Sequence, residues 1–161
     1  MNHSALSAAG RSVVWFGAAA WLAYLKGLAI RSDPLAWVGV VLLVVGSTLH
    51  LWSNVTLARA DRQPSAAPGA LAVSGPYRYV RNPIYLAGFL LLLGTYCLFF
   101  KWNRADVLAG VILILFFHLR VVRAEEPALR SKFGIAYEEY CRRVPRWIPR
   151  WNLPNDPNIP N

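Results

Sequence analysis

The chain has 161 residues, of which 56% are hydrophobic and 16% are charged. A mean hydropathy of +0.35 argues against an ordinary soluble domain, and the length allows one domain at most. Seventeen Lys and Arg residues against eight Asp and Glu give a formal net charge of +9, a balance that often indicates a nucleic-acid partner.

Two uncharged segments predict membrane-spanning helices. Pro34 to Ala58 and Asn82 to Phe100 contain no Asp, Glu, Lys or Arg, and each is close to the roughly 20 residues that cross a bilayer core. We expect spans over residues 35–57 and 83–100. The alternative for each is the buried helix of a large soluble protein, but together with the two further apolar segments below they leave too few residues to build its polar shell.

Two further apolar segments bring the prediction to about four spans. Residues 12–30 are interrupted only by Lys26, and residues 106–122 have a shorter uncharged centre. The first segment could be mistaken for a signal peptide, yet no convincing cleavage site follows it, so we expect an uncleaved anchor. The expected fold class is all-α: a polytopic integral membrane protein with two helical hairpins and a cytoplasmic C-terminal helical segment.

The basic residues are distributed unevenly relative to these spans. With the N-terminus in the cytoplasm, the outer face receives only four of the 17 cations, namely Lys26, Arg31, Lys101 and Arg104. This is the bias of the positive-inside rule. We therefore expect both termini in the cytoplasm, insertion into the inner membrane if the cell is bacterial, membrane lipids with anionic headgroups as partners, and no nucleic acid.

The segment between the second and third predicted spans changes in composition. Residues 58–82 contain prolines, glycines and small residues and are longer than a tight hairpin requires. Long loops in compact proteins are often binding elements, so we expect a cytoplasmic binding loop, with a plain linker as the alternative.

The tail, residues 123–161, is also predicted to be cytoplasmic. Pro127 is placed to open a short helix that Gly134 ends, and a second polar helix is expected from Ile135 to Arg143. Trp147, Ile148 and Trp151 then alternate with arginines and prolines, which suits a segment on the inner membrane surface. The end, residues 152–161, is expected to be disordered.

The two cysteines predict neither a disulfide nor a metal site. Cys97 and Cys141 fall on opposite sides of the membrane in this topology, and neither has a Cys or His neighbour at metal-ligand spacing.

A stretch rich in tyrosine and arginine, Ser74 to Phe89, stands where the third span begins. Asn82 can cap the first helical turn, and Pro83 suits its first position. The amides of Ile84 and Tyr85 then face the cytoplasmic rim, where they could hold a carboxylate or phosphate. Two arginines and three tyrosines add fixed charge and ring faces: Arg78, Arg81, Tyr77, Tyr79 and Tyr85. An interfacial anchor is the alternative reading.

A pair of acidic residues, Glu125 and Glu126, lies at the same rim, just after the fourth span. If that helix continues unbroken, His118 and Glu125 share one face, while Arg123 and Glu126 lie toward the other side. A carboxylate can bind an ammonium group. A helix N-terminus, a glutamate and tyrosine rings together favour a zwitterionic ring-bearing ligand such as S-adenosylmethionine, although ATP or a lipid headgroup would satisfy part of this set.

Three motifs in order resemble the isoprenylcysteine carboxyl methyltransferase family, which is related to the phospholipid N-methyltransferases. They are G-P-Y-R-Y-V-R-N-P-I-Y, then E-E, then F-G-x-x-Y-x-x-Y-x-x-R-V-P-R. The resemblance implies that S-adenosylmethionine binds at the cytoplasmic rim and that a lipophilic acceptor enters from the bilayer, facing Arg120 or Arg123. The cofactor contacts that it implies are Gly69, Ala70, Leu71, Ala72, Tyr77, Asn82, Pro83, Ile84, Tyr85 and Glu125.

One position departs from the family pattern. Asn82 stands where the family usually has histidine, and asparagine keeps the hydrogen bonds but cannot titrate near neutral pH. A role as a base is therefore not expected there, whereas cofactor binding is.

Methyl transfer needs alignment and removal of water more than acid-base help, so we expect few catalytic residues. Arg123 would orient a carboxylate acceptor, which is the expected substrate, on a small molecule or a lipidated protein. For the alternative, an ethanolamine-type phospholipid amine, Glu126 or His118 would take the proton. A packed histidine and a salt bridge from Glu126 to Arg123 or Arg130 are the competing readings.

A transporter and a membrane scaffold are the alternatives to an enzyme. A small multidrug transporter would need an acidic residue inside a span, and none lies in the centre of any span. A non-enzymatic membrane scaffold would need no cofactor. The sequence leaves the oligomeric state open.

Overall fold

The computed structural model describes residues 33–60, 71–99 and 104–150, and these are helical with no strand among them. In chain order the elements are α2 (Pro34–Ala60), the 3₁₀ turn η1 (Gly75–Arg78), α3 (Pro83–Phe99), α4 (Arg104–Arg120), the π-helical turn η2 (Val121–Glu125), α5 (Glu126–Phe133) and α6 (Ile135–Arg143). The predicted all-α class is confirmed for these residues. The expected span at 12–30 and the disordered end at 152–161 lie outside them.

The helix limits follow local signals in the sequence. Helix α2 begins at Pro34, and the Ala36 amide donates to Asp33 Oδ1 at 3.3 Å, so Asp33 caps its first turn. Gly134 separates α5 from α6 with a φ of 52°, a conformation in which glycine carries no Cβ penalty. The two short tail helices were both predicted from Pro127 and Gly134, and they are confirmed.

The start of α3 differs from the expected capping arrangement. The helix begins at Pro83 as predicted, and the Asn82 carbonyl accepts from the Leu86 amide at 3.0 Å. The Asn82 side chain, however, donates to the Arg146 carbonyl at 3.3 Å. The side chain is therefore used to hold the tail of the chain and not to cap the helix.

Two stretches of the described chain, Pro34–Ala60 and Val107–Phe133, are helical, 27 residues long and apolar enough to cross a membrane. The third apolar helix, α3, has 17 residues, the lower end of the usual range. Large apolar side chains project outward from α2 and α4, as shown by Trp37 at 73% exposure and Leu108 at 60%. Such surfaces suit contact with lipid.

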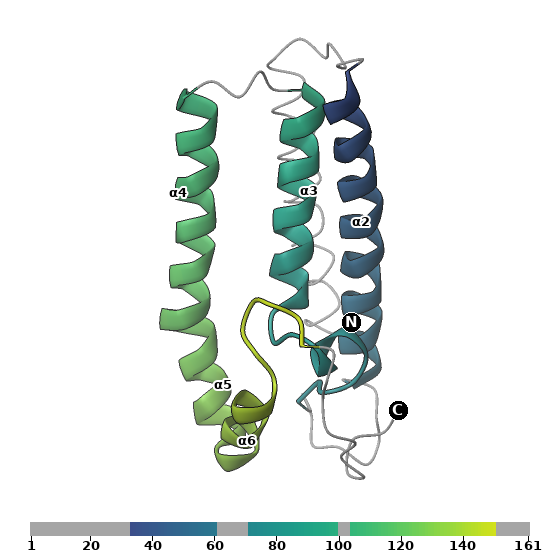
Figure 1. Ribbon diagram of the computed structural model, residues 1–161. Helices are drawn as coiled ribbons and strands as arrows, with labels where there is room; N and C mark the ends of the chain where they lie inside the picture. The colour runs from purple at the N-terminus through teal and green to yellow at the C-terminus, as the bar shows by residue number, and fades with distance from the viewer. Residues whose placement is uncertain (1–32, 61–70, 100–103, 151–161) are drawn as a thin grey trace, which may run out of the picture.

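Helices α2 and α3 pack closely because glycines face each other. A Cβ on Gly39 would lie 2.8 Å from the Gly94 carbonyl oxygen, and one on Gly46 would lie 3.1 Å from Leu91. Small residues of this kind let the backbones of membrane helices approach. The two helices therefore lie side by side along their length (Figure 1).

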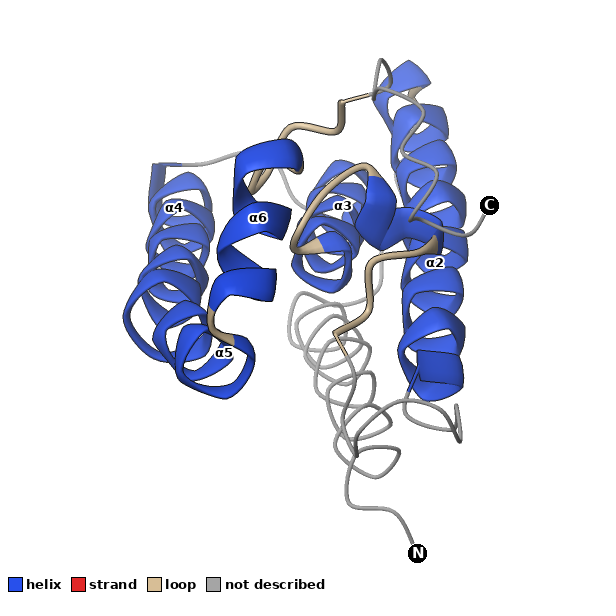
Figure 2. Ribbon diagram, turned by 90° about the horizontal axis from the view of Figure 1, so that it is seen from below, coloured by secondary structure: helices blue, strands red, loops and turns tan. Residues whose placement is uncertain are grey.

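Helix α4 stands apart from α3, and one end of the molecule gathers the polar elements. Because α2 and α4 run toward that end and α3 runs away from it, Ala60, Pro83 and Arg120 lie there together with α5 and α6 (Figure 1). Figure 2 views this end directly, with α6 lying across the space between α4 and α3. Side chains of Tyr85, Phe89, Leu113, Phe117, Val121 and Trp147 fill the adjoining space as one apolar cluster.

Helix α4 does not continue as a regular α-helix into α5. The π-helical turn Val121–Glu125 intervenes, and the Glu126 amide donates to the Val121 carbonyl five residues back. Pro127 explains this turn, because proline lacks an N–H and its ring clashes with the carbonyl of residue i−4, here Arg123. The expectation that Arg123 and Glu126 share one side is wrong: Arg123 is exposed and Glu126 is buried.

Candidate functional site

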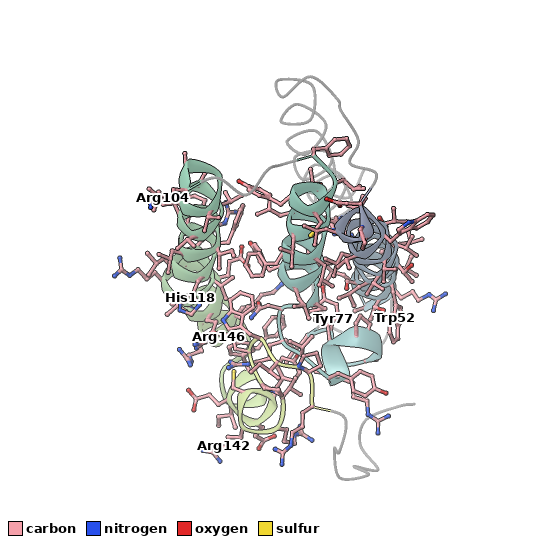
Figure 3. The ribbon with its side chains drawn as sticks, turned by 45° about the horizontal axis from the view of Figure 1, so that its top comes forward. Trp52, Tyr77, Arg104, His118, Arg142 and Arg146 are labelled. Carbon is pink, nitrogen blue, oxygen red and sulfur yellow. The ribbon has the colours of Figure 1, made fainter. Side chains whose placement is uncertain are left out.

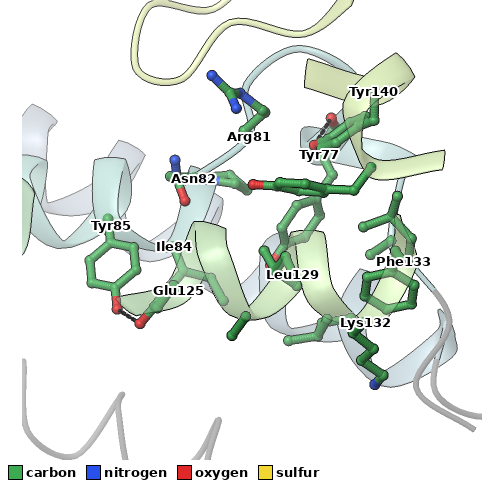
Figure 4. Close-up of a pocket in the computed structure, with 16 residues that line it drawn as sticks. Tyr77, Arg81, Asn82, Ile84, Tyr85, Glu125, Leu129, Lys132, Phe133 and Tyr140 are labelled. Carbon is green, nitrogen blue, oxygen red and sulfur yellow. Dashed lines mark hydrogen bonds between the residues drawn. The ribbon is translucent and has the colours of Figure 1, made fainter. Parts of the chain in front are cut away.

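A pocket of about 390 Å³ opens among the elements gathered at the polar end (Figure 4). This volume falls in the range of small-molecule sites. Its walls come from the end of α2, the segment 71–85, the π-turn, α5 and α6. The lining residues are Leu57, Leu71, Ala72, Tyr77, Arg81, Asn82, Pro83, Ile84, Tyr85, Glu125, Ala128, Leu129, Lys132, Phe133, Tyr137 and Tyr140.

The predicted cofactor residues come together on this lining. All eight that the structure describes line the pocket: Leu71, Ala72, Tyr77, Asn82, Pro83, Ile84, Tyr85 and Glu125. Gly69 and Ala70 lie outside the described residues. Although the residues of the 71–85 segment and Glu125 are some 40 positions apart in sequence, the antiparallel run of α3 and α4 returns the chain to the same end.

Sequence reasoning missed the wall that the tail helices supply. Leu129, Lys132 and Phe133 come from α5, and Tyr137 and Tyr140 come from α6. The signal was present, because the motif F-G-x-x-Y-x-x-Y contains three of these side chains. Arg81, which the sequence offered only as fixed charge near the rim, also lines the pocket.

Glu125 is the acidic residue of the pocket. Its Oε1 accepts a hydrogen bond from the Tyr85 hydroxyl, drawn as a dashed line in Figure 4, and a second from Arg120 Nε at 3.3 Å. The carboxylate therefore joins α3 to the end of α4. Because the Glu125 side chain is 36% exposed, its carboxylate can also contact a cation in the pocket.

Glu126 lies behind the pocket and not on its lining. It is 2% exposed, and its two oxygens accept from Arg146 Nε at 2.7 Å and Arg146 Nη2 at 2.9 Å. Arg81 Nη1 approaches at 3.4 Å and Arg130 Nη2 at 4.0 Å. The hydrogen bonds with Glu126 raise the pKa of the Arg146 guanidinium. Of the expected partners Arg123 and Arg130, Arg130 is the one found near Glu126, at 4.0 Å. The main partner of Glu126 is Arg146.

The tyrosines of α6 are buried donors. Burial, with added contributions from Cys141 and Glu126, raises the pKa of Tyr137 to about 12, and burial likewise raises that of Tyr140. Both phenols are therefore protonated at neutral pH. Tyr140 Oη donates to the Tyr77 carbonyl at 2.8 Å, which fixes α6 against η1.

A shallow apolar groove of about 600 Å³ adjoins the pocket, at the end of α4, the π-turn and the start of α5. Its lining contains Phe116, Leu119, Arg120, Arg123, Ala124, Glu125 and Ala128. Glu125 and Ala128 belong to both the groove and the pocket. The two arginines that the sequence assigned to the acceptor, Arg120 and Arg123, therefore lie at the groove and not on the pocket lining.

His118 and Trp147 contact each other away from the pocket lining. The Trp147 Nε1–H donates to His118 Nδ1 at 3.1 Å, and the Trp147 ring also packs on Phe89, with ring centroids 5.6 Å apart. The packed role considered for His118 agrees with this contact. Trp147 differs from the expected surface position, because it fills the space between α3 and α4, whereas Ile148 is 80% exposed.

Two helical stretches that are apolar enough to cross a membrane both contribute side chains to the ligand-sized pocket. Residues 35–136 match the phospholipid methyltransferase family, and the chain belongs to it. The family resemblance predicted from the three motifs is thereby confirmed. No solved structure matches the chain.

Curated relatives include enzymes and metal-resistance proteins. The chain is 39% identical over 79 residues to the protein-S-isoprenylcysteine O-methyltransferase of Schizosaccharomyces pombe, which covers 49% of this chain and 33% of that protein. It is 28% identical over 123 residues to a nickel-cobalt-cadmium resistance protein of Alcaligenes xylosoxydans xylosoxydans, covering 73% and 54%. A probable protein-S-isoprenylcysteine O-methyltransferase of Oryza sativa is 29% identical over 120 residues, covering 71% and 61%. The chain thus spans less than two thirds of each of these relatives.

Proposed function

We propose that the protein is an integral membrane methyltransferase that uses S-adenosylmethionine and methylates a lipophilic acceptor held in the bilayer. The observation that carries this proposal is the shared position of Glu125, which lines both a ligand-sized pocket with charged side chains among its apolar walls and an apolar groove bearing Arg120 and Arg123. A methyl donor from water and an acceptor from lipid would meet at such a boundary. Family membership supports the same reaction class.

The residues of the pocket fit the chemical groups of S-adenosylmethionine. Glu125 offers a carboxylate for the ammonium group, and Arg81 and Lys132 offer cations for the carboxylate. Aromatic side chains offer faces for the adenine ring and the sulfonium: Tyr77, Tyr85, Phe133, Tyr137 and Tyr140. When bound, this cofactor supplies a methyl group already activated on a sulfonium.

The task of the protein is then to bind and orient its two ligands. Glu125, held by Tyr85 and Arg120, fixes one end of the cofactor site, and the apolar walls exclude water. Arg120 and Arg123 hold the acceptor headgroup at the groove. Glu126 serves as a structural anchor for Arg146 and Arg81, because its carboxylate is buried and already bound.

A carboxylate is the acceptor that this arrangement favours. The two cations at the groove suit an anionic headgroup, and a carboxylate nucleophile needs no base. The relatives named protein-S-isoprenylcysteine O-methyltransferase lead us to an S-isoprenylcysteine carboxylate as the first substrate to test. An ethanolamine-type phospholipid is the second candidate, favoured by the description of the matching family.

Calorimetric titration of the detergent-purified protein with S-adenosylmethionine and S-adenosylhomocysteine tests the proposal. We expect dissociation constants of roughly 1–100 μM for the wild type. Glu125→Gln should bind about ten- to a hundredfold more weakly, because it loses a charge-assisted contact. Glu138→Gln, which alters a 57% exposed glutamate of α6, is the matched control and should bind normally.

Methyl transfer is then measured with N-acetyl-S-farnesylcysteine and with phosphatidylethanolamine in mixed micelles. Transfer to the first alone supports the carboxylate reading, and transfer to the second alone supports the phospholipid reading. Failure of folded wild-type protein to bind either S-adenosylmethionine or S-adenosylhomocysteine, with and without added lipid, would overturn the enzyme proposal in favour of a membrane scaffold.

A further inference from the structure

Residues 144–150 follow α6 and form a strap, which is hydrogen-bonded to the segment just before α3. The Arg81 amide donates to the Pro145 carbonyl at 2.9 Å, and the Arg150 amide donates to the Tyr79 carbonyl at 3.0 Å. Between these two bonds, the Asn82 side chain donates to the Arg146 carbonyl at 3.3 Å. Three hydrogen bonds therefore hold the strap to residues 79–82, of which Arg81 and Asn82 line the pocket.

The middle of the strap reaches α4. Trp147 lies between Phe89 of α3 and His118 of α4, with ring centroids 5.6 Å and 5.8 Å away. Its indole Nε1–H donates to His118 Nδ1 at 3.1 Å. His118 therefore accepts this hydrogen bond through Nδ1.

A contact near His118 would help to hold α4 in place. Helix α4 stands apart from α3 and leads directly into the π-turn, whose geometry is less favourable than that of an α-helix (Figure 1). Arg120 is only two residues beyond His118, and Arg123 lies within the π-turn. A contact that holds His118 therefore helps to fix where both groove arginines lie relative to the pocket.

We propose that Trp147 and His118 are positioning residues, whose hydrogen bond sets Arg120 and Arg123 at the correct place against the cofactor pocket. This inference rests on the proposed function, since it assigns the pair to the alignment of the acceptor. Neither residue lines the pocket or the groove, so neither is a catalytic residue. His118 would then act by holding α4 in position and not by accepting a proton.

Four variants separate the hydrogen bond from simple packing. Trp147→Phe keeps a ring but removes the donor, and His118→Leu removes the acceptor. His118→Gln restores an acceptor oxygen in a similar position, and the double variant Trp147→Phe/His118→Leu completes a double-mutant cycle. Ile148→Ala, at an 80% exposed neighbour in the same strap, is the matched control.

Two readouts are measured on the full-length protein in detergent. The first is kcat and KM for N-acetyl-S-farnesylcysteine, with calorimetry of S-adenosylmethionine alongside. We expect kcat/KM to fall about five- to tenfold in Trp147→Phe and in His118→Leu, with cofactor affinity unchanged. His118→Gln should recover most of the loss, and the double variant should be no worse than either single one.

The second readout is amide hydrogen exchange of the peptide that contains residues 144–150. Exchange should rise in both single variants and stay near wild type in His118→Gln and Ile148→Ala. If exchange rises while wild-type protein binds no cofactor and transfers no methyl group, the proposed function fails and the positioning role fails with it. If wild-type protein is active and the variants keep its kcat/KM, or if losses in the double variant add, only the positioning proposal is overturned.

Discussion

Glu125 and Glu126 are adjacent, yet their carboxylates meet different partners. Glu125 bonds to Tyr85 and Arg120 and lines the pocket. Glu126 turns inward to Arg146 and Arg81. The π-turn that ends between them places two consecutive carboxylates in two settings: one lines the pocket, and the other binds Arg146 of the strap and Arg81.

Glu126→Gln should destabilise the fold. Removing one member of a buried ion pair leaves the other uncompensated, which costs about 3–5 kcal/mol when both are buried. Arg146 is 32% exposed, so we expect about 2–4 kcal/mol. A fall of several degrees in Tm, measured in detergent, would show this. Adding Arg146→Met to Glu126→Gln should cost little more. An unchanged Tm in Glu126→Gln would contradict the anchor role.

At the scale of the element, Pro127 determines the path of the chain from α4 to α5. Its missing N–H and its clash with the Arg123 carbonyl account for the π-turn. Turns of this kind occur frequently at functional sites. Here the turn places Glu125 against Tyr85, on the boundary between pocket and groove.

Pro127→Ala should convert the π-turn toward regular α-helix. The new amide can bond to the Arg123 carbonyl, which removes the cause of the wide turn. Glu125 would then rotate away from Tyr85, and the affinity for S-adenosylmethionine should fall about tenfold while Tm stays equal or rises. Pro149→Ala, in the strap, is the control for loss of a proline. Wild-type affinity in Pro127→Ala would show that the proline is not what positions Glu125.

Helix limits were predictable where a local signal decides them. Pro34, Pro83 and Gly134 mark ends that the structure reproduces. The π-turn was not predictable, because Pro127 reads equally well as the start of a new helix. The Asn82 cap was predicted from the chain neighbours of Asn82, whereas its partner is the Arg146 carbonyl, 64 residues away. The pocket wall on α6 was missed for the same reason, since it depends on how the tail folds back.

At the scale of the whole molecule, charge separates the two ends of the helices. Among the Lys and Arg residues that the structure describes, Arg104 alone lies at the end opposite the pocket (Figure 3). The others lie in the last turn of α2, shortly before α3, or at and beyond the end of α4. An anionic cytoplasmic leaflet attracts such a surface, and translocation of its cations is disfavoured. The pocket is therefore expected on the cytoplasmic side, where a water-soluble methyl donor is available.

This orientation predicts opposite labelling of two matched cysteine variants. Ala105→Cys, at the start of α4, and Ala136→Cys, in α6, both replace exposed alanines without changing charge. In a Cys97→Ser/Cys141→Ser background, a membrane-impermeant maleimide should label Ala105→Cys in intact cells. It should label Ala136→Cys only after the membrane is opened or in inverted vesicles. Labelling of Ala136→Cys from outside would reverse the topology and place the pocket where the methyl donor is absent, which would remove the physical basis for a cytoplasmic methyltransferase site.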